Sequence, residues 1–205
     1  MKYAFGFYCE AECNRPGSSY LLSVIFIPIS QDLLHMFMPV VVWSANMNNL
    51  VTVDAVLKFT DEGDLILEDS NKNSTVWSAG TSGKSVVSIN LTDTGNLVLF
   101  DKNNVVVWQS FDHPTDTLLR GQKLMLGKKL VPRVSTIKWT EKIQLSLALT
   151  AHGLYAVAGT KPPLSYYSFP SELSDDSYAA WENDTFYLYS GKEKRVIKSY
   201  SVNVL

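Results

Sequence analysis

The chain has 205 residues, of which 46% are hydrophobic, 12% aromatic and only 19% charged. This composition is typical of a folded globular protein and excludes a disordered chain. The net charge of −2 lacks the basic excess of a nucleic-acid binder, and the length excludes a complete protein kinase, whose catalytic motifs do not occur.

The first part of the chain holds its two cysteines and its longest apolar run. Cys9 and Cys13 would be thiols or half of a metal site in a reducing compartment, or could form a bridge in an oxidising one. The three histidines are scattered and complete no ligand set, so we expect neither a metal nor a cofactor. The run over residues 21–29 is half the length of a membrane span and predicts a buried strand. The chain start lacks the apolar core of a secretory signal peptide.

An internal repeat follows. Residues 57–69 align with residues 89–101, 32 positions further on, and both copies alternate apolar and polar side chains around a Thr-Asp-x-Gly turn. This pattern predicts one β-hairpin per copy. Gly63 and Gly95 are expected in the left-handed conformation that such a turn needs.

A third predicted strand, carrying one tryptophan, follows each hairpin. An earlier copy of this strand over residues 41–44 has lost or hidden its hairpin. Repeated units of strands predict three small sheets that bury their Leu and Trp faces around a common axis. The tryptophans expected in this core are Trp43, Trp77 and Trp108.

Several longer stretches resemble a known family. Residues 108–119 read WQSFDHPTDTLL, residues 41–46 read VVWSAN, and residues 5–8 read FGFY. Together with the hairpin repeat, they are similar to the bulb-type (monocot mannose-binding) lectin domain of plant S-locus glycoproteins and G-type lectin S-receptor-like serine/threonine kinases. The resemblance extends over residues 4–130.

The resemblance implies an all-β fold of the β-prism II type, with three short, four-stranded antiparallel sheets around a pseudo-threefold axis. It implies a lectin domain over residues 1–130 without its N-terminal strand and signal peptide. Part of a second, diverged lectin-like β lobe is expected over residues 131–205, where a weaker copy of the hairpin pattern occurs at 149–155 and one more strand is expected at 183–191. The family's kinase and transmembrane segments are missing, so we expect a fragment or truncated gene product.

The family holds mannose with the motif Q-x-D-x-N-x-V-x-Y, whose alternate residues share one face of a strand. Its polar side chains bond the sugar hydroxyls, and its Val packs on the sugar ring. Neither copy is intact here, and each lost neutral hydrogen bond costs about 0.5–1.5 kcal/mol, so mannose binding is expected to be weak or lost. The motif positions are Thr60, Glu62, Asp64, Ile66 and Glu68 in the first copy, and Thr92, Thr94, Asn96, Val98 and Phe100 in the second.

Other motifs indicate no catalytic chemistry. Residues 80–85 end like a phosphate-binding loop but lack its first glycine and a following helix. Asp112, His113 and Asp116 suggest a metal or a base–carboxylate pair, but no nucleophile or second histidine accompanies them. N-glycosylation sequons stand at Asn73, Asn90 and Asn183.

The resemblance therefore implies a non-enzymatic recognition module that is extracellular or at the cell surface in the parent family. Its partners would be mannose-type glycans or, as the alternative, a protein ligand or second copy at a dimerisation surface with vestigial sugar sites. Neither nucleic acid nor a membrane segment is expected. Secretion would favour a disulfide between Cys9 and Cys13, which the family's cysteines near this position also support.

Overall fold

The computed structural model describes residues 2–9, 13, 15, 17–28, 38–71, 74–132, 145–159 and 164–199. These residues are mostly in β-strands, with one short 3-10 turn, η1 (Ser110–Asp112), so the predicted all-β class is confirmed. The described strands form five small sheets in two compact units, Met1–His113 and Pro114–Leu205. The lectin-domain limit at residue 130 stays a prediction, because a compact unit and a family domain are different things.

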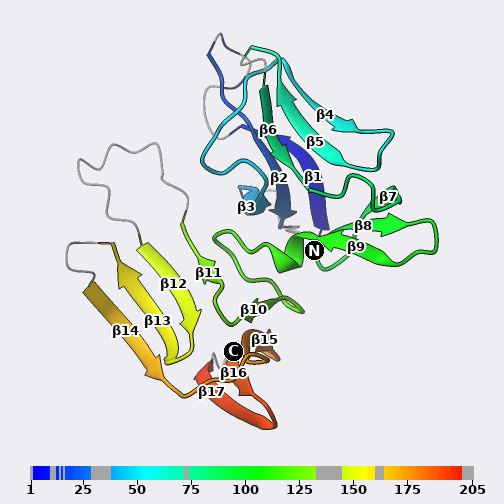
Figure 1. Ribbon diagram of the computed structural model, residues 1–205. Helices are drawn as coiled ribbons and strands as arrows, with labels where there is room; N and C mark the ends of the chain where they lie inside the picture. The colour runs from blue at the N-terminus through cyan, green and yellow to red at the C-terminus, as the bar shows by residue number, and fades with distance from the viewer. Residues whose placement is uncertain are drawn as a thin grey trace. The chain divides into compact units, whose positions relative to one another are not determined.

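The first unit contains three antiparallel sheets, each with its strands in chain order (Figure 1). Each middle strand pairs with both of its neighbours, as expected for a hairpin followed by a tryptophan strand. The family's four strands per sheet are reduced to three among the described residues. The sheets are β1 (Lys2–Tyr8), β2 (Leu21–Ile27) and β3 (Val40–Ser44); β4 (Ala55–Phe59), β5 (Leu65–Asp69) and β6 (Ser74–Ser78); and β7 (Val86–Leu91), β8 (Leu97–Asp101) and β9 (Val106–Gln109).

The first sheet contains the hairpin that the sequence pattern conceals. Strands β1 and β2 pair along their full length, and β2 then pairs with β3. The connection from β1 to β2 has no Thr-Asp-x-Gly turn and instead carries Cys9 and Cys13, which form a disulfide with their Cα atoms 5.8 Å apart. The predicted bridge is confirmed, and the hairpin of this copy was hidden rather than lost.

The three tryptophans meet at the centre of the first unit. Their ring centroids are 5.8–6.0 Å apart and their planes lie at 71–75° to one another, so each ring presents an edge to its neighbour. This triangle relates the three sheets by an approximate threefold axis, as predicted. In the strand register Trp43 lies opposite Val24, Trp77 opposite Leu67, and Trp108 opposite Leu99.

The hairpin turns give a first testable prediction. Gly63 and Gly95 have φ of +80° and +85°, which confirms their predicted conformation. A Cβ at Gly63 would lie 2.8 Å from the Val86 carbonyl oxygen, whereas Gly83, with φ +76°, has open space around it. Alanine at either position costs about 1–2 kcal/mol for the left-handed backbone, and at Gly63 it must also displace the Val86 backbone. We expect Gly63→Ala to lower Tm more than Gly83→Ala in a thermal melt; equal shifts would contradict this.

The second unit contains two four-stranded antiparallel sheets (Figure 1). Its buried core is formed by Leu124, Leu149, Leu154, Ala179, Phe186 and Leu188. One sheet has the strand order β10 (Lys123–Met125), β15 (Tyr178–Glu182), β16 (Thr185–Ser190) and β17 (Glu193–Ser199). The other has the order β11 (Lys129–Leu130), β12 (Leu145–Thr150), β13 (Gly153–Ala158) and β14 (Leu164–Pro170).

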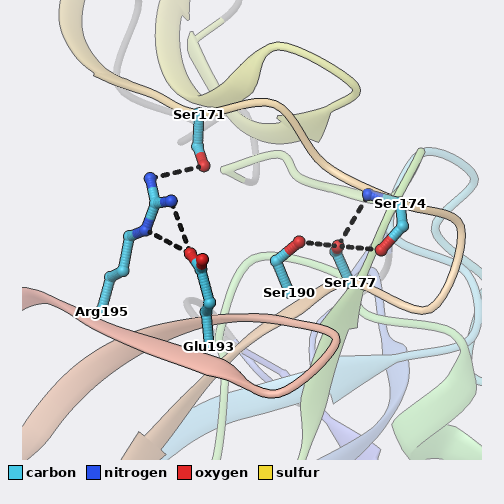
Figure 2. Close-up of polar contacts among 6 residues, drawn as sticks. All are labelled: Ser171, Ser174, Ser177, Ser190, Glu193 and Arg195. Atoms are coloured by element: carbon cyan, nitrogen blue, oxygen red, sulfur yellow. Dashed lines mark hydrogen bonds and ion pairs between the residues drawn. The ribbon is translucent and has the colours of Figure 1, made fainter.

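Side-chain contacts hold the connection between β14 and β15 against the rest of this unit (Figure 2). Arg195 of β17 donates to the Ser171 hydroxyl at 3.1 Å and also pairs with Glu193. The buried Ser177 hydroxyl donates to Ser190 at 3.2 Å and accepts from the Ser174 backbone N–H at 3.1 Å. These contacts order a segment that has no regular secondary structure of its own.

Within the described residues, no helix is long and apolar enough to cross a bilayer.

Candidate functional site

The two copies of the predicted sugar motif begin in the hairpin turns of the first unit. Thr60 Oγ1 accepts a hydrogen bond from the Asp64 backbone N–H at 3.0 Å, and Thr92 Oγ1 accepts one from the Asn96 N–H at the same distance. Both threonines stand where the family motif has Gln. Each hydroxyl oxygen therefore closes its turn by accepting a hydrogen bond from the backbone.

Asp64, at the motif's Asn position, is a buried internal acceptor. Its carboxylate accepts from the Ser78 hydroxyl at 2.6 Å and from the Thr81 N–H at 3.0 Å, and the Thr81 hydroxyl oxygen lies 3.1 Å from it. Burial opposes its ionisation and tends to raise its pKa, but these hydrogen bonds together hold the pKa below its ordinary value. Asp64 thus ties the β4–β5 turn to the end of β6 and the loop after it.

Asn96 performs the same task in the second copy. Its Nδ2 donates to Gln109 Oε1 at 2.8 Å, and its Oδ1 accepts from the Ser110 hydroxyl and the Phe111 N–H, each at 3.2 Å. Gln109 in turn donates to Asp112 at 3.0 Å. The amide that the family uses for sugar hydroxyls is here engaged on both sides by the protein.

A third anchor was not singled out from the sequence. Asn46 is buried, accepts from the Leu22 N–H at 2.8 Å, and donates to the Tyr20 and Asn49 carbonyls at 3.1 Å. It ties β2 to the turn after β3, and it lies outside the sugar motif. Asn46 lies in the VVWSAN stretch that carries part of the family resemblance, but a local motif cannot predict a hydrogen-bond partner 24 residues away.

The remaining motif residues have local partners or apolar surroundings. Glu68, at the motif's Tyr position, forms an ion pair with Lys58, and Glu62 accepts from Ser82 at 2.5 Å. The hydroxyls of Thr94 and Thr92 are 2.9 Å apart. Val98 is buried, whereas Ile66 and Phe100 are half-buried.

The arrangement leaves few free polar groups for a sugar at either motif. The deep positions, Asp64 and Asn96, hydrogen-bond inside the fold, and Phe100 has no hydroxyl to offer. Each lost sugar bond would cost about 0.5–1.5 kcal/mol, against about −4 kcal/mol for a whole millimolar site. In both copies, the residue at the motif's Asn position therefore hydrogen-bonds to the protein itself.

Structural contacts also account for the other motifs. In the loop over 80–85, the buried Thr81 hydroxyl donates to the Gly63 carbonyl at 2.8 Å. The His113 ring stacks on Trp108 at 5.2 Å, and its carbonyl accepts from Trp43 Nε1 at 2.9 Å. These residues support the hairpin turn and the tryptophan cluster.

The three sequons have different surroundings. Asn90 is exposed on β7. Asn183 is exposed in the turn between β15 and β16, with φ +47°. Asn73 lies outside the described residues, so its predicted place in a turn stays a prediction.

Comparison with known proteins agrees with the fold and the motifs. Residues 40–140 match the family model described as D-mannose binding lectin. The chain therefore carries a bulb-type lectin domain of this family, which confirms the resemblance drawn from the sequence.

Similar proteins include plant receptor-like kinases and a secreted glycoprotein. The G-type lectin S-receptor-like serine/threonine-protein kinase SD2-5 of Arabidopsis thaliana is 34% identical over 141 residues, which is 68% of this chain and 17% of the kinase. A second Arabidopsis kinase of this type, At5g35370, is 40% identical over 94 residues, or 46% of this chain and 11% of the kinase. The epidermis-specific secreted glycoprotein EP1 of Daucus carota is 40% identical over 152 residues, or 71% of this chain and 38% of EP1. The chain thus spans well under half the length of these relatives.

Proposed function

We propose that this chain is a non-catalytic, extracellular carbohydrate-recognition module of the kind found in receptor-like kinase ectodomains, with both motif sites degenerate for mannose. The lectin family match and the receptor and secreted relatives support the recognition role. The observation that carries the degeneracy is the internal engagement of Asp64 and Asn96.

Affinity chromatography on immobilised mannose tests the proposal. We expect the full chain, secreted with a supplied leader, to pass through the column. The variant Asn90→Gln with Thr94→Asp and Phe100→Tyr removes the sequon next to the second copy and restores two motif groups, one in the turn before β8 and one on β8. We expect it to be retarded and to be released by free mannose.

A matched variant, Asn90→Gln with Thr94→Ala and Phe100→Leu, controls for nonspecific effects of changing these positions. Circular dichroism must report a β-rich fold for all three proteins. Retention of the wild type with release by mannose would overturn the degeneracy, and retention of the control variant would show that restored motif groups are not the cause.

A second candidate is a protein interaction or dimerisation module with vestigial sugar sites. The internal hydrogen bonds of the motif residues also favour this candidate. A domain whose motif groups no longer face a sugar still has a surface that can bind a protein. Free mannose would not compete with such a partner, whereas it would compete with a lectin ligand.

A further inference from the structure

The sequon at Asn90 shares a sheet face with the second sugar motif. In the register of β7 and β8, Asn90 lies directly opposite Val98, and Ser88 lies opposite Phe100. Opposed residues of an antiparallel pair project to the same face, with Cβ atoms about 4.5–5.5 Å apart and diagonal neighbours about 7–8 Å away. The exposed Asn90 therefore stands beside the motif residues Val98, Asn96 and Phe100 on their own face.

The first repeat shows what a side chain at this register position does. Lys58 lies opposite Ile66 just as Asn90 lies opposite Val98. From there its ammonium reaches diagonally to Glu68, the residue at the motif's Tyr position, and forms an ion pair. A group attached at the same place in the second repeat would likewise reach the equivalent residue, Phe100.

We propose that Asn90 is N-glycosylated and that its glycan covers the second motif face, so that this face carries a glycan and does not bind one. The inference rests on the extracellular role proposed above, because the modification needs the secretory route. The acceptor sequence is complete, with Thr92 two residues after Asn90.

The transfer uses an oligosaccharide carried on a polyprenyl pyrophosphate. Asn90 Nδ2 forms a bond to C1 of the first sugar while the bond between C1 and the pyrophosphate oxygen breaks. The amide loses one proton, and the polyprenyl pyrophosphate leaves. After folding, the Thr92 hydroxyl takes its place in the hairpin turn, where it accepts from the Asn96 N–H.

Attachment at this position has a consequence for recognition. The first sugar of the glycan would lie over the half-buried Phe100 ring and the edge of Asn96. Lys58 and Glu68 already occupy the corresponding face of the first repeat with an ion pair. Both motif faces would then be closed to mannose, one by protein side chains and the other by the chain's own glycan.

The first experiment measures occupancy on the full chain, secreted with a supplied leader. Intact mass and glycopeptide analysis are applied to the wild type, Asn90→Gln and the control Asn183→Gln, whose site is in the second unit. We expect Asn90→Gln to lose one glycan mass and the wild-type peptide around residue 90 to carry a glycan. An unmodified Asn90 in secreted protein would overturn the proposal, and because the leader is supplied, that result would not bear on the extracellular role.

The second experiment measures whether the glycan covers the face. Ser88→Cys introduces a thiol opposite Phe100, and Val56→Cys places one opposite Glu68 at the equivalent position of the first repeat. The two native cysteines are paired, so each variant has one free thiol. We expect a bulky maleimide to label Ser88→Cys several-fold faster when Asn90→Gln is added, with no change for Val56→Cys. Equal rates at Ser88→Cys with and without the glycan would overturn the covering of the motif.

Discussion

Replacing Trp108 by alanine is expected to lower the free energy of unfolding of the first unit by about 3–5 kcal/mol. Trp108 contacts both other tryptophans of the central cluster edge-on at 5.8 Å and stacks on the His113 ring at 5.2 Å. Its removal leaves a cavity that all three sheets line. Urea titration followed by far-UV circular dichroism measures the loss.

Two matched variants make the result specific. Trp108→Phe keeps an aromatic ring in the cluster and should lose less than half as much as the alanine variant. Trp181 stacks on Phe186 in the second unit at 4.9 Å, and Trp181→Ala should affect only the transition of that unit. An unchanged first-unit transition in Trp108→Ala would refute the central role of the cluster.

The tryptophan cluster could be predicted from the sequence because the pattern that produces it is local and repeats along the chain. Each Trp follows a strand with alternating apolar residues, and the spacing between copies stays close to the length of one small sheet. The same reasoning found the turn glycines Gly63 and Gly95, whose left-handed backbone is a local requirement. The hairpin of the first sheet escaped because β1 and β2 are joined by the disulfide-bearing connection and share no turn signature with the other copies.

The roles of the motif residues were less accessible. Alternation along β8 and the residue before it places Asn96, Val98 and Phe100 on one face, which is all that a period of two can establish. Whether the Asn96 amide faces a ligand or the protein depends on Gln109 and Ser110, which come from another strand and the turn after it. The role of Asn46 could not be predicted for the same reason, because its hydrogen-bond partner in β2 is distant in sequence. Such long-range hydrogen bonds have no periodic signal.

Among substitutions of the polar motif residues, we expect replacement of Asp64 to have the largest effect on the free energy of unfolding. Asp64→Ala removes the acceptor of the Ser78 hydroxyl and leaves the buried Thr81 N–H without a partner, so we expect a loss of about 2–4 kcal/mol in unfolding free energy. Asp64→Asn places in the first repeat the amide that Asn96 supplies in the second, and its loss should be about 1 kcal/mol. The reverse exchange, Asn96→Asp, sets a carboxylate against Gln109 Oε1 and should cost more than Asp64→Asn.

The ionisation of Asp64 adds a pH dependence with a definite sign. Because hydrogen bonding outweighs burial and lowers its pKa in the folded state, the carboxylate stabilises the fold fully above its unfolded pKa, which is about 3.9. That contribution is lost as the pH falls through the lowered folded value. The wild type should therefore be more stable than Asp64→Asn at neutral pH, and the difference should shrink as the pH falls below about 4. Urea titrations of both proteins from neutral pH into this acid range measure the difference. If the stability difference between the two proteins does not change with pH, the folded state does not favour the charged form of Asp64. A neutral side chain would then make the same hydrogen bonds equally well.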